Sequence, residues 1–303
     1  MISIVIPLYN KELSIQKTLL SVLNQTFCDF EIIVVNDGSS DKSAERVQEL
    51  NDNRIKLVSQ ENMGVCSARN RGIELSLFPL IAFLDADDYW DPHYLEEQIR
   101  FINDFPEAAM WGINFTIVNG NQTLMLYTGL PENFRGYVND YFTMKRVSDL
   151  YCSSSVIIKK EAFNVAGNFD IRIKYSEDLD MWYRIILNFP TAFYSKSLVY
   201  YNHNAENRSL ITHPKLNRFL PYFIDKYIPF KINADFWKYF NSFCASKLSY
   251  YYFETKAERK EAIEIKRKMD LSVLSRKYRL IYGTPWLVGY IILKLVKIKQ
   301  KVF

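Results

Sequence analysis

The sequence predicts an α/β fold, a Rossmann-like, mostly parallel sheet flanked by helices, with a helical extension at the C-terminal end. Three observations lead to this prediction. Short apolar runs typical of buried strands alternate with helical patterns over roughly the first hundred residues. Polar clusters follow several of these runs, at the strand ends where open α/β sheets bind ligands. Beyond residue 213 the chain becomes helical and rich in Tyr, Phe and Lys.

Composition indicates a folded chain with one main domain and an extension. Of its 303 residues, 49% are hydrophobic and 24% are charged, which is the balance of a globular protein. We expect one domain over residues 1–212 and a helical region over residues 213–303. Four cysteines without Cys-x-x-Cys spacing, and an N-terminus without a basic flank, favour a reducing cytoplasm over secretion. The longest apolar runs fall short of about 18 uncharged residues, so no membrane-spanning helix is predicted.

The elements of the first half follow from the spacing of apolar residues. Residues 3–7 form the first predicted strand, and apolar positions at helical spacing predict a helix over residues 12–24. A continuous β-branched run predicts a buried strand over residues 30–35. The next elements are a helix over 41–50, a strand over 54–59, a helix over 65–76, a strand within 80–90 and a helix from 92 to about 103.

The second predicted strand ends in the polar turn 36–41. Ser39 and Ser40 are expected to accept backbone N–H bonds as caps of the following helix. Asp37 stands at the end of the strand itself and is left to face a ligand.

Residues 80–90 carry the most distinctive chemistry, because Asp85, Asp87 and Asp88 follow an apolar run. On a continuing strand, Asp85 and Asp87 would point to the same face. Two adjacent carboxylates repel each other unless a cation lies between them, and a hard divalent cation suits oxygen ligands. The alternative is that Asp88 or Asp91 caps the next helix, since a proline follows Asp91. Capping accounts for Asp91 but not for Asp85 and Asp87.

The second half of the main domain is predicted to be mixed. Acidic residues at positions 177 and 178 begin a helix, where the helix dipole favours them. The elements are β-like segments over 108–126 with a turn at 119–121, a loop-rich segment over 128–150, a strand over 153–158, a short helix over 160–165, a helix over 178–188 and a strand over 191–201 that leads to His203.

The C-terminal region differs in charge from the rest of the chain. Residues 256–303 contain 13 Lys or Arg against 4 Asp or Glu, whereas the remaining residues contain 25 against 30. A basic tail favours a negatively charged partner such as anionic lipid or nucleic acid, and a solvated helix face is the alternative.

The last segment, residues 285–303, is apolar but interrupted by lysines. Lys294, Lys297 and Lys301 share one helical face. We expect a helix that lies in a membrane interface, with the aromatic residues at 286 and 290 as anchors. The alternative is packing on the main domain or on a second subunit.

The same sequence disfavours two common nucleotide-binding classes. No Gly-x-Gly-x-x-Gly follows a strand, and no Gly-Lys-Ser/Thr loop is present. A dinucleotide oxidoreductase and a P-loop NTPase are therefore both disfavoured.

Six short motifs occur in a fixed order over about residues 1–210. They are Val-Ile-Pro-Leu-Tyr-Asn at 5–10, Val-Asn-Asp-Gly-Ser-Ser-Asp at 35–41, Asn-Met-Gly at 62–64 running into Ala-Arg-Asn-Arg-Gly at 68–72, Leu-Asp-Ala-Asp-Asp at 84–88, Gly-Asn-Phe-Asp at 167–170, and Glu-Asp at 177–178 with Trp182 and Arg184. Together they resemble glycosyltransferase family 2, whose members are inverting enzymes with a GT-A fold. The resemblance implies a nucleotide-binding half over about 1–105 and an acceptor-binding half over about 106–212.

The resemblance implies a donor nucleotide site. Pro7, Tyr9 and Asn10 would form the nucleobase pocket with Asp37, which would accept a hydrogen bond from a uracil N–H. Arg69 would be a second contact to the nucleotide.

The resemblance also implies a metal and a general base. Asp85 would lie beside the ribose and the metal, and Asp87 of this Asp-x-Asp motif would ligate Mn²⁺ or Mg²⁺ on the diphosphate. Asp178 would be the general base, with Glu177 as the fallback. Trp182 would pack against the acceptor.

His203 would be a further metal ligand on the diphosphate side, and a structural histidine is the alternative.

The implied donor is a UDP-hexose or a UDP-N-acetylhexosamine, and the acceptor is a hydroxyl of a glycan or lipid-linked sugar in surface polysaccharide synthesis. We expect a cytoplasmic protein, peripheral at the inner face of the membrane, without a nucleic-acid partner; a homo-oligomer through residues 213–303 is the alternative to membrane contact.

Two other functions compete with a glycosyltransferase. One is a non-catalytic glycan-binding or scaffold protein with the same fold. The other is a sugar nucleotidyltransferase, which would need a Gly-rich, basic triphosphate loop after the first strand. That position instead reads Leu-Tyr-Asn-Lys-Glu over residues 8–12, which argues against it.

Overall fold

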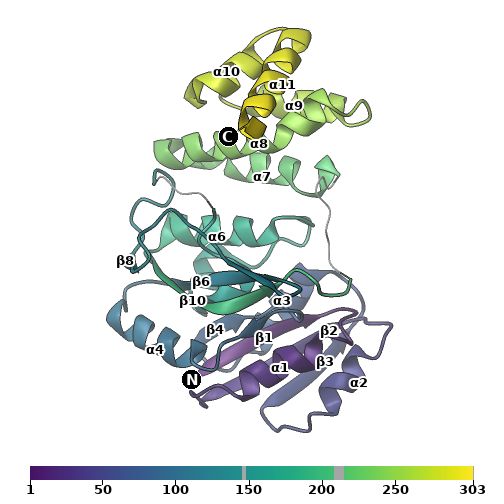
Figure 1. Cartoon of the computed structure of the whole chain (residues 1–303), viewed down its shortest axis with the longest axis vertical. Helices are drawn as coiled ribbons and strands as arrows, with labels where there is room; N and C mark the ends of the chain where they lie inside the picture. The colour runs from purple at the N-terminus through teal and green to yellow at the C-terminus, as the bar shows by residue number, and fades with distance from the viewer. Residues whose placement is uncertain (145–147, 208–214, 303) are drawn as a thin grey trace. The chain divides into compact units, whose positions relative to one another are not determined.

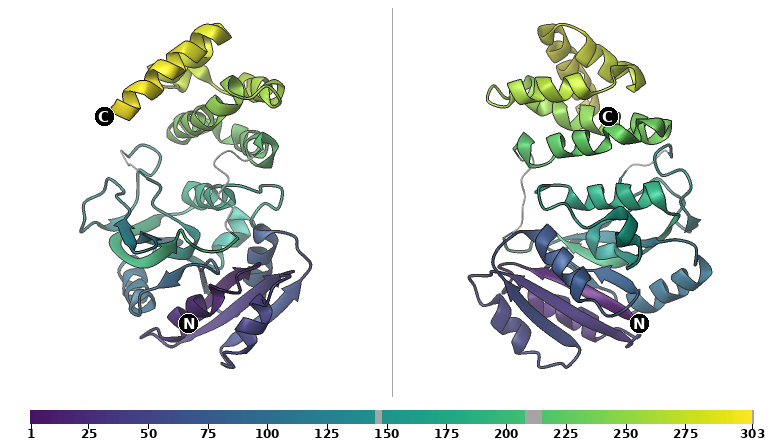
Figure 2. Two further views of the ribbon diagram at one scale, coloured as in Figure 1. Left: turned by 45° about the vertical axis from the view of Figure 1, so that its right-hand side comes forward. Right: turned by 180° about the vertical axis from the view of Figure 1, so that it is seen from behind.

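The computed structural model describes residues 1–144, 148–207 and 215–302, and the chain forms two compact units (Figures 1 and 2). Unit 1 comprises residues 1–141, 145–171 and 176–210, and unit 2 comprises residues 142–144, 172–175 and 211–303. The expected domain boundary between residues 212 and 213 falls outside the described residues. The predicted α/β fold, with a mostly parallel sheet and a helical C-terminal part, is confirmed.

Unit 1 is built on one sheet with the strand order β3-β2-β1-β4-β9-β6-β10-β5, with β7 beside β6 and β8 beside β10. Four neighbouring strands are parallel: β1 (Ile2–Leu8), β2 (Phe30–Asp37), β3 (Ile55–Gln60) and β4 (Leu80–Phe83). The other strands are β5 (Tyr89–Trp90), β6 (Met110–Asn119), β7 (Gln122–Met125), β8 (Arg135–Tyr137), β9 (Val156–Lys159) and β10 (Thr191–Asn202). β9 runs antiparallel to both β4 and β6, while β10 is parallel to β6.

Helices cover both faces of this sheet, because alternate strand side chains point to opposite sides. Ile4 and Ile32 belong to a core cluster with the apolar side of α1, whereas Ile33 and Val35 pack with Ala68 of α3. The helices of unit 1 are α1 (Ile15–Leu23), α2 (Ser43–Gln48), α3 (Val65–Leu75), α4 (Tyr94–Asp104), α5 (Ala162–Ala166) and α6 (Glu177–Asn188). A 3₁₀ turn, η1 (Ser153–Ser155), replaces the first residues of the strand expected over 153–158.

The strand expected within residues 80–90 is interrupted. Its pairing with β1 ends at Phe83, which lies opposite Val5. The Leu84 N–H still donates to the Val5 carbonyl at 3.1 Å, but the Asp85 N–H turns away from β1 and donates to Ser154 Oγ at 3.1 Å. Asp85 and Asp87 therefore lie in a turn, and the prediction that they share one face of a strand is wrong.

The helix after this turn begins later than expected. α4 starts at Tyr94 rather than at residue 92. Asp91 nevertheless accepts the N–H of His93 on Oδ1 at 2.9 Å, so its side chain stabilises the turn that enters the helix.

Unit 2 is helical and has an aromatic core. Phe219, Phe223, Tyr227, Phe236 and Phe240 are buried and meet in edge-to-face and tilted pairs. Its helices are η2 (Leu216–Arg218), α7 (Leu220–Tyr227), η3 (Ile228–Ile232), α8 (Ala234–Phe253), α9 (Arg259–Lys268), η4 (Leu271–Val273), α10 (Arg276–Gly283) and α11 (Trp286–Val302). Among the helices that the structure describes, none combines the length and the apolar character needed to span a bilayer.

Close packing of α3 on β1 depends on Gly72, where a Cβ would lie 2.2 Å from Val5 Cγ1. Gly72→Ala is expected to lower the free energy of unfolding by about 1–3 kcal/mol, because the added methyl forces the helix off the sheet. This loss outweighs the better helix propensity of alanine. Urea unfolding followed by tryptophan fluorescence measures it.

Gly136→Ala is the matched control in the same unit. The nearest atom to its added Cβ is Phe134 Cζ, at 3.9 Å. We expect a change within about 0.5 kcal/mol. Equal destabilisation by both substitutions would contradict the packing argument.

Candidate functional site

The candidate site lies at the carboxyl ends of three neighbouring parallel strands. β1 runs between β2 and β4, so the ends of all three meet at one edge of the sheet (Figure 1). Residues 7–10, Asp37 and Asp85 are at or just beyond these ends. The sequence predicted this convergence from the alternation of strands and helices, and the strand order agrees with it.

Arg69 of α3 connects two parts of this edge. Its side chain is 4% exposed, and its guanidinium donates to Asp85 Oδ1 and to Glu177 Oε1, each at 2.8 Å. The guanidinium also lies over the Phe169 ring, 5.4 Å from the centroid. The two carboxylates raise the pKa of Arg69 against the effect of its burial. Arg69 thus joins α3, the end of β4 and the start of α6, and its contact with a nucleotide stays a prediction.

Asp178 follows Glu177 in the first turn of α6. Burial raises the pKa of Asp178 to about 7; repulsion by Glu177 adds to the rise, and the charge of Arg69 opposes it. The Leu179 N–H donates to Asp178 Oδ1 at 2.8 Å and orients the carboxyl group. A carboxyl group with this pKa changes protonation near neutral pH, which suits a general acid or base.

Asp37 is almost fully buried, at 3% exposure, and its carboxylate organises a neighbouring turn. Oδ1 accepts from the Met63 N–H at 2.9 Å and from Gln60 Nε2 at 2.8 Å, and Oδ2 accepts from the Gly64 N–H at 2.8 Å. Gly38, with φ +72°, lets the two segments approach, since a Cβ there would lie 2.9 Å from the Asn62 nitrogen. The contact of Asp37 with a nucleobase stays a prediction.

The loops after β1 and β2 are joined through Asn10, which has φ +50°. Asn10 Oδ1 accepts from the Ser40 N–H at 2.8 Å, and the Asn10 N–H donates to Ser39 Oγ at 3.1 Å. The prediction that these two serines cap the next helix is therefore wrong; Asp41 instead accepts the Ser43 N–H at 3.0 Å. Beside Asn10, Tyr9 is 40% exposed, while Pro7 is partly buried.

The three aspartates after β4 have different surroundings. Asp85 faces Arg69, and Asp87 Oδ2 accepts from Lys11 Nζ at 2.8 Å. Asp88 is 1% exposed and accepts from Ser154 Oγ at 2.6 Å and from the Asn202 N–H at 2.9 Å. Burial, followed by repulsion from Asp87 and Asp85, raises the pKa of Asp88. Asp88 thus anchors the turn to β10 rather than facing the site.

These contacts define the cation chemistry that the edge can support. Within the described residues, no group of three or more His, Cys, Asp or Glu side chains is placed to hold a metal ion. Asp85 and Asp87 offer two carboxylates. Such a set fits Mg²⁺ or Mn²⁺ when phosphate oxygens and water complete the coordination, and it does not fit an all-protein cage.

Sequence reasoning missed Lys11 and Glu206. Lys11 directly follows the polar cluster after β1, but its charge alone gives no indication of its partner. Besides Asp87, its ammonium contacts the Glu206 carbonyl oxygen at 2.5 Å. Glu206 follows β10, almost 200 residues from Lys11, and no sequence motif contains both.

Trp182 is buried, and the His203 ring packs against another ring. Trp182 is fully buried and meets Phe169 edge to face at 6.3 Å between centroids. An acceptor reaches this ring only if neighbouring side chains move, so the acceptor contact stays a prediction. The His203 ring packs against Tyr201 at 5.4 Å, and its backbone N–H donates to the Val118 carbonyl. Its role as a metal ligand also stays a prediction.

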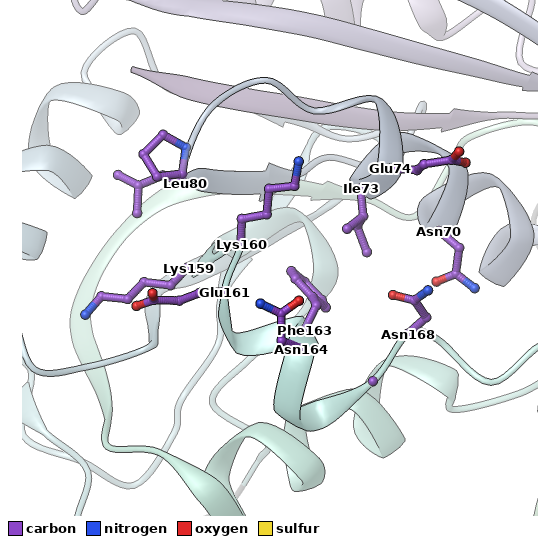
Figure 3. A pocket seen from close by; sticks show the side chains of 12 residues that line it. Asn70, Ile73, Glu74, Leu80, Lys159, Lys160, Glu161, Phe163, Asn164 and Asn168 are labelled. Carbon is purple, nitrogen blue, oxygen red and sulfur yellow. The ribbon is translucent and has the colours of Figure 1, made fainter.

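A cavity of about 820 Å³ lies at the other end of β4, between α3 and α5 (Figure 3). Ile73 and Phe163 contribute apolar surface to it. Its two lysines are already engaged, because Lys159 Nζ donates to the Pro106 carbonyl and Lys160 Nζ to the Ser76 carbonyl. Neither Arg69 nor Ser154, which both contact Asp85, lines this cavity, so it is not part of the site.

Comparison with known sequences identifies one family. The sequence profile described as Glycosyl transferase family 2 matches residues 3–166. The chain is 39% identical over 187 residues to the UDP-Glc:alpha-D-GlcNAc-diphosphoundecaprenol beta-1,3-glucosyltransferase WfgD of Escherichia coli, covering 61% of this chain and 70% of that protein. It is 33% identical over 141 residues to Glycosyltransferase GlyA of Streptococcus pneumoniae, covering 46% of this chain but only 20% of that protein.

Comparison with solved structures supports the fold. The structure of S. aureus TarS 1-349 in complex with UDP has a TM-score of 0.75, with 18% identity, over 99% of this chain and 91% of that one. The complex of the same protein with UDP-GlcNAc has a TM-score of 0.74, with 17% identity and the same coverage.

The pKa of Asp178 can be measured directly. In a ¹³C-carboxyl NMR titration we expect the Asp178 signal to titrate near pH 7, so that the group is ionised above this pH and protonated below it. Glu177→Gln is expected to move the midpoint to lower pH, because it removes a repelling charge. Glu74→Gln, at a 66% exposed position on α3, is the control and should leave the midpoint unchanged. A wild-type midpoint below pH 5 would contradict the assignment.

Proposed function

This chain belongs to glycosyltransferase family 2, and from this premise we propose that it is an inverting, metal-dependent hexosyl- or N-acetylhexosaminyltransferase. The donor is a UDP-hexose or a UDP-N-acetylhexosamine. The acceptor is a hydroxyl of a glycan or lipid-linked sugar in surface polysaccharide synthesis. Two findings support these choices: the TarS structures contain UDP and UDP-GlcNAc, and WfgD is named for a diphosphoundecaprenol-linked acceptor.

The observation that carries the proposal is the charge network of Asp85, Arg69, Glu177 and Asp178. Arg69 bonds both Asp85 and Glu177, and its charge also acts on Asp178. A carboxylate for the donor and a carboxyl group with a pKa of about 7 are therefore linked through one buried cation. Transfer with inversion needs both a stabilised diphosphate and a base for the acceptor hydroxyl.

In the proposed mechanism, Asp178 removes the proton from the attacking hydroxyl. Its pKa of about 7 leaves a large ionised fraction at neutral pH, while the group stays basic enough to accept a proton. The Leu179 N–H fixes the orientation of the carboxylate, and Arg69 limits its repulsion by Glu177. The hydroxyl attacks the anomeric carbon from the face opposite the diphosphate, so a single displacement inverts the configuration.

At the donor end, Asp85 and Asp87 would hold Mn²⁺ or Mg²⁺, with His203 as a further candidate ligand. The bound ion would neutralise charge on the leaving nucleoside diphosphate. Pro7, Tyr9 and Asn10 would line the nucleobase pocket with Asp37. Trp182 would lie beside the acceptor after a local rearrangement.

Donor profiling tests the proposed function. We expect UDP-sugars to raise the melting temperature when Mn²⁺ is present, and one of them to be turned over with a lipid-linked acceptor. Asp178→Asn should lower kcat by about 10²–10⁴-fold, the usual contribution of a general base, yet retain the thermal shift. Product analysis by NMR reports whether the anomeric configuration is inverted.

Glu74→Gln serves as the control and should keep wild-type turnover. If Asp178→Asn turns over normally, Asp178 is not the base and Glu177 becomes the candidate. Asp180 is a poorer replacement, because it is fully buried and bonded to Arg184 at 2.7 Å. A thermal shift without turnover of any donor would favour the non-catalytic alternative.

We also propose that α11 of unit 2 lies on the cytoplasmic face of a membrane. Its inner side buries Leu293, whereas its outer side exposes four large apolar side chains: Leu287, Val288, Ile291 and Leu295. An amphipathic helix of this kind in a basic region suits the interface of an anionic bilayer. Lys294 is 46% exposed, but the side chains of Lys297 and Lys301 fall outside the described part.

Vesicle sedimentation tests this membrane contact. The double substitution Ile291→Glu with Leu295→Glu should reduce partition onto phosphatidylglycerol-containing vesicles about tenfold or more, because two apolar side chains no longer enter the interface. Ile232→Glu is the control, since Ile232 is 95% exposed in η3 of the same unit. Unchanged partition of the double variant would remove the support for membrane contact and favour the subunit alternative.

A further inference from the structure

Lys11 occupies a position that the proposed mechanism leaves unexplained. Its ammonium lies 2.8 Å from Asp87 Oδ2, and the two side chains are only 12% and 15% exposed. The same ammonium donates to the Glu206 carbonyl at 2.5 Å and lies 3.4 Å from the Asn207 carbonyl oxygen. One lysine after β1 thus holds both the turn after β4 and the segment after β10.

A second contact of opposite sign joins the same segments. The Glu206 carboxylate accepts the Leu13 and Ser14 N–H groups on Oε1, each at 3.0 Å, and the Ser14 hydroxyl on Oε2. These groups lie at the entry to α1, where free N–H groups and the helix dipole favour an anion. We call the set of Lys11, Asp87 and Glu206 the Lys11 latch.

The latch conflicts with a metal ion at Asp87. An ammonium within hydrogen-bond distance of Oδ2 neutralises the carboxylate on which the proposed function relies for a divalent cation. A divalent ion on the same carboxylate would come within a few ångströms of the ammonium, and like charges at that distance repel strongly. Asp85 cannot replace Asp87 as a metal ligand without weakening its ion pair with Arg69.

We propose that Lys11 is a built-in cation that competes with the divalent metal for Asp87, and that its displacement by the metal and the donor diphosphate loosens Glu206 from the α1 loop. This inference rests on the proposed function, because it takes Asp87 to be a metal ligand. It adds a residue to the donor site and couples metal loading to the segment at residues 206–207. Once displaced, the ammonium would be available to pair with the negative charge of the donor diphosphate.

Metal binding without catalysis gives the first test. We measure Mn²⁺ affinity by electron paramagnetic resonance on the full chain, with no nucleotide and then with UDP. Lys11→Met should bind Mn²⁺ at least about fivefold more tightly than wild type without nucleotide, the lower end of typical coupling between two ligands. Lys11→Arg keeps the charge and should stay near wild type. Lys42→Met removes an exposed lysine of the neighbouring loop and controls for net charge.

Hydrogen exchange gives an independent second test. In wild type, Mn²⁺ with UDP should speed exchange of the Leu13 amide, because Glu206 releases it. The effect on the Ser14 amide should be smaller, because its N–H also donates to the Lys11 carbonyl at 3.2 Å. In Lys11→Met these amides should exchange faster even without metal, and Mn²⁺ should add little. Glu206→Ala, which removes the acceptor oxygen, should also expose them, and this separates loosening of the latch from loss of the lysine.

The outcomes discriminate between the proposals. Equal Mn²⁺ affinity in wild type and Lys11→Met, with both folded by circular dichroism, would overturn the competition and leave Lys11 as a structural ion pair. Failure of every variant to bind Mn²⁺ would also overturn it. In that case, UDP binding and sugar transfer without metal would still support a glycosyltransferase while contradicting its metal dependence, so the two failures are distinguishable.

Discussion

The bridge that Arg69 forms between two carboxylates is the interaction on which the site depends. A buried guanidinium is costly unless carboxylates compensate it, and removal of one partner from such a cluster leaves an uncompensated charge. Asp85 lies in the turn after β4, and Glu177 begins α6. The relative placement of these two segments at the sheet edge is therefore fixed by one side chain of α3. Burial is the main cause of the raised pKa of Asp178, and the same arrangement adjusts it, since Glu177 raises this pKa further and Arg69 lowers it.

Each acidic residue at this edge is matched by a different kind of partner. Arg69 donates to Asp85 and Glu177, and Lys11 donates to Asp87. Neutral hydroxyl and amide groups donate to Asp88 and Asp37. A carboxylate bound only by hydroxyl and amide groups keeps its place whatever cation arrives. A carboxylate paired with a lysine ammonium can exchange that cation for another. The division separates the residues that hold the edge together from those whose charge is available to a ligand.

The order of elements and the convergence of strand ends were predictable, because both follow from apolar periodicity and the general rules of parallel sheets. The end of β4 at Phe83 was not, because it depends on a hydroxyl of Ser154, far along the chain from Asp85. The roles of Ser39 and Ser40 were missed for the same reason: their partner, Asn10, belongs to another strand end. Sequence pattern identifies the chemical groups, while long-range pairing decides which of them meet.

The Lys11–Asp87 pair shows why that distinction matters for function. From sequence, Asp87 is half of an Asp-x-Asp pair and suggests a cation from solution. In the fold, a cation from the chain already lies on it, and the same cation holds the backbone after β10. A site that supplies its own counter-charge is stable without ligand, and a ligand must offer more than charge neutralisation to bind there. A divalent ion bound to a diphosphate meets this requirement. The phosphate oxygens complete the coordination of the ion, and the diphosphate provides an anion for the displaced ammonium. Such a site would respond to the complete metal–nucleotide pair more strongly than to either component.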